Sequence, residues 1–144
     1  MSQQIHIDKY TNWSSMKIRR PNMKGKQKIL IIDDNKETVS GLKSFFNNKY
    51  TTVTAGNGLD GLKAFENDIE GFDLIVTDLI MPEISGVALI EIIKKKSPAK
   101  PIIAITGWGH HPKALAIEAK ANLVLEKPFE MDVLDQSITK LLTK

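Results

Sequence analysis

The chain from position 27 onward alternates short apolar runs with segments in which apolar residues recur every three or four positions. A short run of branched apolar residues without polar alternation is typical of a strand buried on both faces, as in parallel sheets. The pattern predicts five strands, at residues 28–34, 51–55, 73–77, 101–105 and 123–125.

The intervening segments predict five helices. They cover residues 36–48, about 59–69, a segment marked by Val87, Leu89, Ile90 and Ile93, residues 112 to about 120, and 131–142. Asp34 followed by Glu37 is typical of a capping box for the first helix, and Pro112 suits the first position of the fourth. Gly61 costs the second helix about 1 kcal/mol relative to alanine, and the pattern offers no reason for it. The strict alternation predicts an α/β fold, a parallel sheet with helices on both faces and right-handed crossovers.

Composition limits the class of protein. The chain has 144 residues, which is the length of one ordinary domain, and it has no cysteine. A disulfide framework, a thiolate zinc site and a cysteine nucleophile are therefore excluded. No apolar run approaches the roughly 20 residues of a membrane span, and the N-terminus lacks the apolar stretch of a signal peptide. The sequence therefore predicts a cytoplasmic domain without a membrane span.

The charge is unevenly distributed along the chain. Residues 1–28 contain seven basic side chains and one acid, a net charge of +6, whereas the remainder has a net charge of −3. We interpret residues 1–26 as a flexible basic tail, with an arm that contacts an anionic partner as the alternative, and residues 27–144 as the domain. Because the domain itself is mildly acidic, no direct contact with nucleic acid is expected.

Polar residues follow the predicted strands at their carboxyl ends. These residues are Asp33, Asp34, Asp78, Thr106 and Lys127. Each has a simpler explanation taken singly, such as a helix cap, a loop turn or a solvated side chain. However, the carboxyl ends of parallel strands lie at one edge of the sheet, where ligands of such folds bind. We therefore expect these side chains to form one site.

The chemistry of this set favours a metal ion and a phosphoryl group. Two carboxylates 4 Å apart repel by about 4 kcal/mol at an effective dielectric constant near 20, so clustered acids require a proton or a cation. An all-oxygen site with room for water suits Mg²⁺. Lys127 and Thr106 supply an ammonium and a hydroxyl suited to phosphoryl oxygens. Asp78, from a central strand, is the best candidate nucleophile, which leaves Asp33 and Asp34 to hold the metal.

Four segments resemble the receiver domain of two-component response regulators, the CheY-like family, over residues 27–144. They are KILIIDD at 28–34, VTDLIMPEISG at 76–86, IAITG at 103–107 and LEKPF at 125–129. The resemblance implies a flavodoxin-like, five-stranded parallel sheet of order 2-1-3-4-5 with five helices on both faces.

The resemblance also implies a function, a phosphorelay in which Asp78 accepts a phosphoryl group from a phosphohistidine on a sensor histidine kinase or phosphotransfer protein. Asp34 would bind Mg²⁺ directly, Asp33 mostly through water, and the backbone carbonyl of Ile80 would complete the protein ligands. Lys127, preceding a cis peptide bond to Pro128, would contact the phosphoryl group, and Thr106 would donate a hydrogen bond to it.

The same resemblance describes how the domain signals. A chain of this kind is not an enzyme for a separate substrate, because it catalyses only its own phosphorylation and dephosphorylation. Movement of Thr106 and the loop 107–112 would transmit the signal to an unknown downstream protein. The helix after Thr106, the last strand and the closing helix form the expected partner face, and the chain is expected to be a monomer or a phosphorylation-dependent dimer.

The sequence departs from the family pattern at three positions. Val124 replaces an aromatic residue that swings inward in many members, so an aromatic switch is not expected. Ile80 and Trp108 are bulky and apolar. We hypothesise that they restrict the water that attacks the aspartyl-phosphate; in the alternative, Trp108 packs in its loop or meets a partner. We interpret His110 and His111 as solvated loop residues.

Two alternative functions remain open. The chain is interpreted as a stand-alone receiver with no output domain, or alternatively as a fragment of a hybrid histidine kinase or larger regulator. A Mg²⁺-dependent phosphatase of the haloacid-dehalogenase type is a remote alternative. That chemistry requires a second acid two positions after the nucleophile on the first strand, where this chain has Asp33, Asp34 and Asn35.

Overall fold

The computed structural model of the protein describes residues 26–107 and 112–143. The predicted basic tail therefore lies, apart from Lys26, outside the described residues, as do Trp108, His110 and His111.

A five-stranded sheet forms the centre of the molecule. Its strands are β1 (Lys28–Ile32), β2 (Thr51–Ala55), β3 (Leu74–Asp78), β4 (Ile102–Thr106) and β5 (Leu123–Glu126). All neighbouring pairs are parallel, and the order is β2-β1-β3-β4-β5. This confirms the predicted flavodoxin-like order. β3 and β4 are buried along their whole length because they have neighbours on both sides and helices on both faces.

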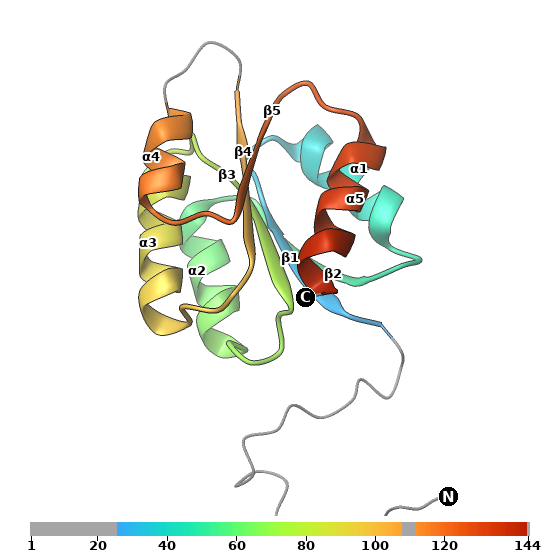
Figure 1. Cartoon of the computed structure of the whole chain (residues 1–144), viewed down its shortest axis with the longest axis horizontal. Helices are drawn as coiled ribbons and strands as arrows, with labels where there is room; N and C mark the ends of the chain where they lie inside the picture. The colour runs from blue at the N-terminus through green and yellow to red at the C-terminus, as the bar shows by residue number, and fades with distance from the viewer. Residues whose placement is uncertain (1–25, 108–111, 144) are drawn as a thin grey trace, which may run out of the picture.

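Five helices cover the two faces of the sheet. They are α1 (Lys36–Phe46), α2 (Gly58–Asn67), α3 (Gly86–Lys96), α4 (Pro112–Glu118) and α5 (Met131–Leu142). Figure 1 shows α2, α3 and α4 on one face and α1 and α5 on the other. No described helix has the length and apolar character needed to cross a membrane.

Each face of the sheet has its own hydrophobic core. Side chains alternate along β1, so Leu30 and Ile32 pack with Phe65 and Leu89, on the face covered by α2, α3 and α4. Ile29 and Ile31 belong to the second core, on the face covered by α1 and α5. These two cores hold the strands in register, so that all five end at the same edge.

The predicted capping box of the first helix is wrong. The N-cap of α1 is Asn35, whose Oδ1 accepts a hydrogen bond of 3.0 Å from the amide of Thr38. Because α1 begins at Lys36, Asp34 lies one position too early to cap it. The Asp34 carboxylate is therefore not used in the helix cap.

The structure explains Gly61. A Cβ atom at this position would lie 2.6 Å from Cδ1 and 2.9 Å from Cγ1 of Ile32. Since Ile32 is buried at the end of β1, α2 could not lie this close to the sheet with a larger residue at position 61. The helix-propensity cost of glycine is thus offset by close packing.

Candidate functional site

The strands bring the predicted site residues to one edge of the sheet. Asp33 directly follows β1, Asp78 ends β3, Thr106 ends β4 and Lys127 directly follows β5. Asp33 is 1% exposed, Asp78 6% and Thr106 2%, whereas Asp34 is exposed. The site therefore combines two buried carboxylates with an accessible one.

The charged groups of the site are close together. Nζ of Lys127 donates a hydrogen bond of 3.0 Å to Oδ2 of Asp33 and lies 3.6 Å from Oδ2 of Asp78. Each of Asp33, Asp34 and Asp78 offers a carboxylate oxygen within 4.8 Å of those of the other two. The Lys127 ammonium thus faces two acids, with Asp34 beside them, and the cluster has excess negative charge.

Backbone amides hold the two buried carboxylates in place. The amide of Asn35 donates a hydrogen bond of 2.9 Å to Oδ1 of Asp33. The amide of Ile80 donates one of 3.2 Å to Oδ1 of Asp78. In both cases the chain turns after the strand and bonds back, two residues later, to the carboxylate at the strand end. Each acid is therefore oriented by its own loop.

Burial and neighbouring charge shift the pKa values in the site. Burial, and then the negative charge of Asp33, raise the pKa of Asp78, although Lys127 and the Ile80 amide oppose this. Burial lowers the pKa of Lys127, but its hydrogen bond to Asp33 and the charges of Asp33 and Asp78 outweigh burial, so that this pKa is raised. Both directions indicate a site that would accommodate an additional cation.

The acids fit a magnesium ion. Among the described residues, Asp33, Asp34 and Asp78 are the group whose ligand atoms approach closely enough to share a metal. All of these donor atoms are carboxylate oxygens, which are the ligands that Mg²⁺ prefers. Because Asp34 is exposed, solvent water has access to the site.

Thr106 lies at the same edge, but its hydroxyl points elsewhere. Its Oγ1 donates a hydrogen bond of 3.3 Å to the carbonyl of Gly107. Its own carbonyl accepts a hydrogen bond of 2.8 Å from the amide of Lys127, which links the ends of β4 and β5. The backbones of Thr106 and Lys127 are therefore hydrogen-bonded neighbours, and the Thr106 hydroxyl is directed toward the loop that follows β4.

One feature implied by the resemblance, and two positions that depart from the family pattern, can be placed in the structure. The peptide bond between Lys127 and Pro128 is cis. Val124 is half-buried and packs against the core on the α2, α3 and α4 face. The Ile80 side chain, which belongs to the site loop, is 49% exposed.

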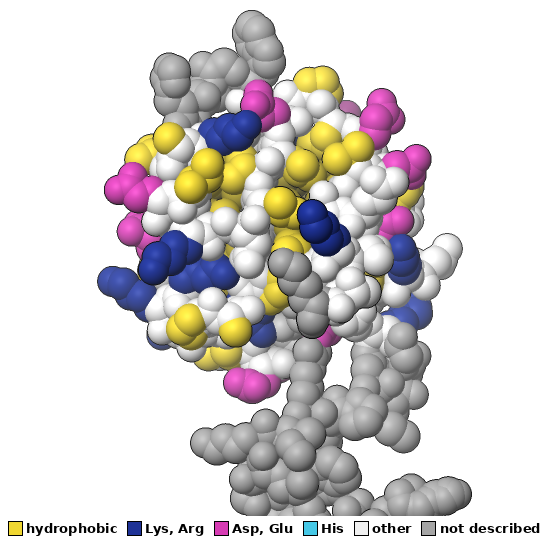
Figure 2. Space-filling view, viewed as in Figure 1, with side chains coloured by type: hydrophobic (Ala, Val, Ile, Leu, Met, Phe, Trp, Pro, Cys, Tyr) yellow, Lys and Arg dark blue, Asp and Glu magenta, His cyan; other side chains and the backbone are white. Residues whose placement is uncertain are grey.

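Exposed apolar side chains occur on and near the expected partner face. Leu115 and Ile117 of α4 and Val133 of α5 are exposed. Figure 2 shows several separate groups of hydrophobic atoms on this side of the molecule. Of the described side chains in α4 and directly after it, those of Ala116 and Ala119 are buried and the others are exposed. This helix therefore has a small contact with the core.

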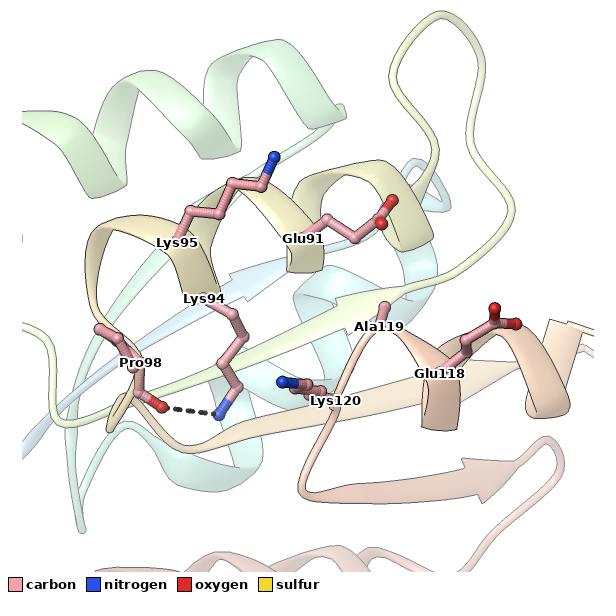
Figure 3. Close-up of a pocket in the computed structure, with 7 residues that line it drawn as sticks. All are labelled: Glu91, Lys94, Lys95, Pro98, Glu118, Ala119 and Lys120. Carbon is pink, nitrogen blue, oxygen red and sulfur yellow. Dashed lines mark hydrogen bonds between the residues drawn. The ribbon is translucent and has the colours of Figure 1, made fainter.

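A groove that the sequence did not predict lies between α3 and α4. Its volume is about 370 Å³, and its lining comprises Glu91, Lys94, Lys95, Pro98, Glu118, Ala119 and Lys120 (Figure 3). Lys94 donates from Nζ to the carbonyl of Lys100 at 2.7 Å and to Oδ1 of Asn122 at 2.8 Å. These partners precede β4 and β5, so this end of the groove lies at the edge where the strands begin, away from Asp78.

The chain matches proteins of known family. The model of a family described as response regulator receiver domain matches residues 29–139. The transcriptional regulatory protein GlrR of Escherichia coli (strain K12) is 34% identical over 113 residues, which are 76% of this chain and 25% of that protein. The sensor kinase CckA of Brucella abortus (strain 2308) is 26% identical over 117 residues, which are 81% of this chain and 12% of that protein. The chain thus spans a quarter or less of the length of these two relatives.

Solved structures agree with this match. A response regulator receiver domain protein from Clostridium thermocellum superposes with a TM-score of 0.77 at 29% identity. The superposition covers 81% of this chain and 94% of that one.

Proposed function

This chain belongs to the response regulator receiver domain family, and from that premise we propose that its Asp78 carboxylate accepts a phosphoryl group from a phosphohistidine. One observation carries the proposal: a carboxylate that is only 6% exposed lies 3.6 Å from the Lys127 ammonium, beside two further acids. An acid in such surroundings supplies a nucleophile, and the ammonium supplies a positive charge for the incoming group.

The transfer requires no general base from the protein. An oxygen of ionised Asp78 forms a bond to phosphorus as the bond from phosphorus to the imidazole nitrogen breaks, and that nitrogen keeps the electron pair. Lys127 offsets the negative charge of the phosphoryl oxygens. Asp33, Asp34, Asp78 and the backbone carbonyl of Ile80 would hold Mg²⁺, which when bound would neutralise further negative charge on the phosphoryl group.

Signalling is proposed to begin at Thr106. Its hydroxyl bonds to the Gly107 carbonyl in this structure and would rotate toward the oxygens of a phosphoryl group on Asp78. The loop after β4 and α4 would follow, which is a shift between two states of the domain. The small buried surface of α4 supports this proposal, because a weakly held helix can move at low cost.

The phosphoryl donor and the downstream target of the domain are also proposals. We propose a sensor histidine kinase or phosphotransfer protein as the donor, a downstream protein as the target, and no activity on a separate substrate. Two relatives are a transcriptional regulatory protein and a sensor kinase, each much longer than this chain. Action alone and action within a longer protein would use the same chemistry. The cytoplasmic location and the oligomeric state stay predictions.

Ile80 is proposed to prolong the phosphorylated state. Its side chain belongs to the loop that donates a hydrogen bond to Asp78, and it is apolar where a polar residue would help to position water. The rate of phosphate loss from wild type and from Ile80→Asn tests this, and equal lifetimes would discard it. The contribution proposed for Trp108 falls on a residue outside the described part of the chain.

The main test is incubation with acetyl phosphate and Mg²⁺ followed by intact mass measurement. Wild type should gain one phosphoryl group and Asp78→Ala none. Asp132→Ala, which removes an exposed acid from α5, should behave as wild type and serves as the matched control. Equal labelling of wild type and Asp78→Ala would refute Asp78 as the acceptor. Repeated turnover of a phosphate ester would instead favour the phosphatase alternative.

A further inference from the structure

The loop between β3 and α3, residues 79–85, is tightly folded against the site. The amide of Ile80 bonds to Asp78 at its start, and Oγ of Ser85 accepts a hydrogen bond of 3.2 Å from Ala88 at its end. The amide of Gly86 donates a hydrogen bond of 2.9 Å back to the carbonyl of Leu79. The loop is therefore closed on itself, and the Ile80 backbone lies within it.

A contact from α2 supports this loop from outside. A Cβ atom at Gly58, the first residue of α2, would lie 2.5 Å from the carbonyl oxygen and 2.9 Å from Cβ of Ile84. Backbone atoms cannot be approached this closely by a side chain, so α2 and the loop can only meet here because residue 58 is a glycine. At Gly86 a Cβ atom would overlap the Asp78 carbonyl oxygen, which limits the loop from the other end.

Helix α2 is itself held firmly. Oδ1 of Asn57 caps it with a hydrogen bond of 2.7 Å from the amide of Asp60. One turn later, Gly61 lies against Ile32, the residue before Asp33. The start of α2 therefore touches the backbone that follows Asp78 and the strand that leads to Asp33. The start of α2 is thus a packed surface against which the loop rests.

We propose that Gly58 is a positioning residue for the metal site. By lacking a side chain, it lets the Ile84 backbone rest on α2, and so keeps the loop in the shape that places the Ile80 backbone beside the acids. This inference rests on the proposed function, since it assigns Gly58 a part in binding the same Mg²⁺. A methyl group at residue 58 would have to move the loop by about 1 Å to reach an ordinary contact distance. Displacements of this size strongly weaken a site that depends on geometry.

The test compares three glycine-to-alanine variants of the full chain. Mg²⁺ affinity is measured by calorimetric titration, and amide hydrogen exchange is followed over residues 79–86. Gly58→Ala should bind Mg²⁺ about tenfold more weakly and exchange faster in this loop. Gly61→Ala also overlaps its neighbour, but that neighbour is the Ile32 side chain, so it should lower stability with a much smaller change in affinity. Gly56→Ala, with no atom within 4 Å of its added methyl, should match wild type.

Several outcomes would overturn the proposal. One is Mg²⁺ binding by folded Gly58→Ala within twofold of wild type, and another is equal losses of affinity in Gly58→Ala and Gly61→Ala. If Gly58→Ala does not fold, Ile84→Gly loosens the same contact, and unchanged Mg²⁺ affinity in that variant would count against the proposal. A wild-type chain that binds no Mg²⁺ would refute the proposed function instead. Unchanged exchange over residues 79–86 would then still refute the role of Gly58 in the loop.

Discussion

Charged side chains lie at both edges of the sheet, but the balance between positive and negative groups differs between the two edges. At the edge where the strands end, Asp33 and Asp78 share the ammonium of Lys127, and a carboxylate oxygen of Asp34 lies within 4.8 Å of theirs. At the edge where the strands begin, Nζ of Lys28 bonds to Oδ2 of Asp68 at 2.7 Å, and the amide of Lys28 bonds to Oδ2 of Asp73 at 2.7 Å. Nζ of Lys100 bonds to the carbonyls of Ile69, at 2.8 Å, and Phe72.

The difference separates a structural role from a functional one. We call the edge where the strands begin the amino edge, and the edge where they end the carboxyl edge. Each bond at the amino edge links a loop or a helix to the start of a strand, and each ammonium there is paired with a carboxylate or a carbonyl oxygen. At the carboxyl edge the fold keeps like charges together although they repel one another. Natural proteins depart from good electrostatics mainly at functional sites. Removing an acid at the carboxyl edge should therefore stabilise the metal-free protein, whereas removing a bonded side chain at the amino edge should destabilise it.

The largest effect is expected from Lys127→Met in metal-free protein. The substitution removes the ammonium and leaves Asp33 and Asp78 buried without a counter-charge, which costs 3–5 kcal/mol for a fully buried pair. Because the Lys127 side chain is 29% exposed, we expect a smaller loss, about 2–3 kcal/mol, in urea unfolding with chelator. Mg²⁺ should restore part of the stability, since it supplies positive charge to the same acids.

A second substitution checks the cause of that loss. Asp78→Asn in the Lys127→Met background should recover much of the lost stability, because it removes one of the unpaired charges. If the double variant is as unstable as Lys127→Met alone, the loss comes from packing of the lysine stem and not from charge.

At the amino edge, Asn122→Ala should destabilise the protein by about 2 kcal/mol. Oδ1 of Asn122 accepts hydrogen bonds from Nζ of Lys94 at 2.8 Å and from the amide of Ile102 at 2.9 Å. Its loss leaves a buried backbone amide without this acceptor, and an unpaired buried donor costs about 1–3 kcal/mol. Urea unfolding measures the change, with Asn67→Ala at the exposed end of α2 as the control. Unlike Lys127→Met, Asn122→Ala should be equally destabilised with and without Mg²⁺, and rescue by Mg²⁺ would contradict the comparison.

Removing a charge at the carboxyl edge should stabilise the metal-free protein. Asp78→Asn removes a charge that burial and the repulsion from Asp33 disfavour, and it loses the weaker attraction to Lys127, for a net gain of about 1 kcal/mol at pH 7. The pKa of Asp78 is raised above its ordinary 3.8, so folded protein holds this proton more tightly than unfolded protein does. The protonated group therefore favours folding fully below 3.8, and this contribution is lost as the pH rises through the folded pKa.

The pH dependence provides the measurement. The stability difference between Asp78→Asn and wild type should be small near pH 4, grow as the pH rises above the ordinary pKa of 3.8, and level off above the raised pKa of the folded protein. A variant that is no more stable than wild type at pH 7 would show that Asp78 is not under electrostatic strain in the metal-free protein.

The helices, the strands and the residues at the strand ends were predictable because each depends on the pattern of apolar residues in one short segment. The unbroken apolar runs before Asp33 and Asp78 identify strands with neighbours on both sides, and parallel strands must end together. The strand order depended on the family resemblance. The cap of α1 was missed because Asp34 and Asn35 are both good capping residues, and only the start of the helix distinguishes them.

Contacts between distant segments were not predictable from the sequence. Gly61 is unfavourable for a helix, and glycine is needed there because α2 packs closely against the Ile32 side chain of β1. Gly58 looks like part of a turn, and its contact is with Ile84 in another loop. The direction of the Thr106 hydroxyl and the bonds of Lys94 likewise depend on which backbone atoms the fold brings near them.

The smallest effect is expected at Lys120, beyond the end of α4. Its φ of 75° is in the left-handed region, where a Cβ atom costs about 1 kcal/mol. The amide of Lys120 bonds to the Ile117 carbonyl at 3.0 Å and that of Ala121 to the Ala116 carbonyl at 3.0 Å, the helix ending that favours glycine. Lys120→Gly should therefore stabilise the protein by about 0.5 kcal/mol in urea unfolding, since greater freedom of the unfolded chain offsets part of the gain.

The matched variant lies at the other edge. Glu83, with a φ of 67°, is in the same conformation within the loop that follows Asp78. Glu83→Gly should give a similar gain in stability but weaken Mg²⁺ binding, because the loop then samples more conformations before the ion binds. Lys120→Gly should leave Mg²⁺ affinity unchanged. If both variants change affinity equally, the two edges are coupled, and the separation of a structural edge from a functional one does not hold.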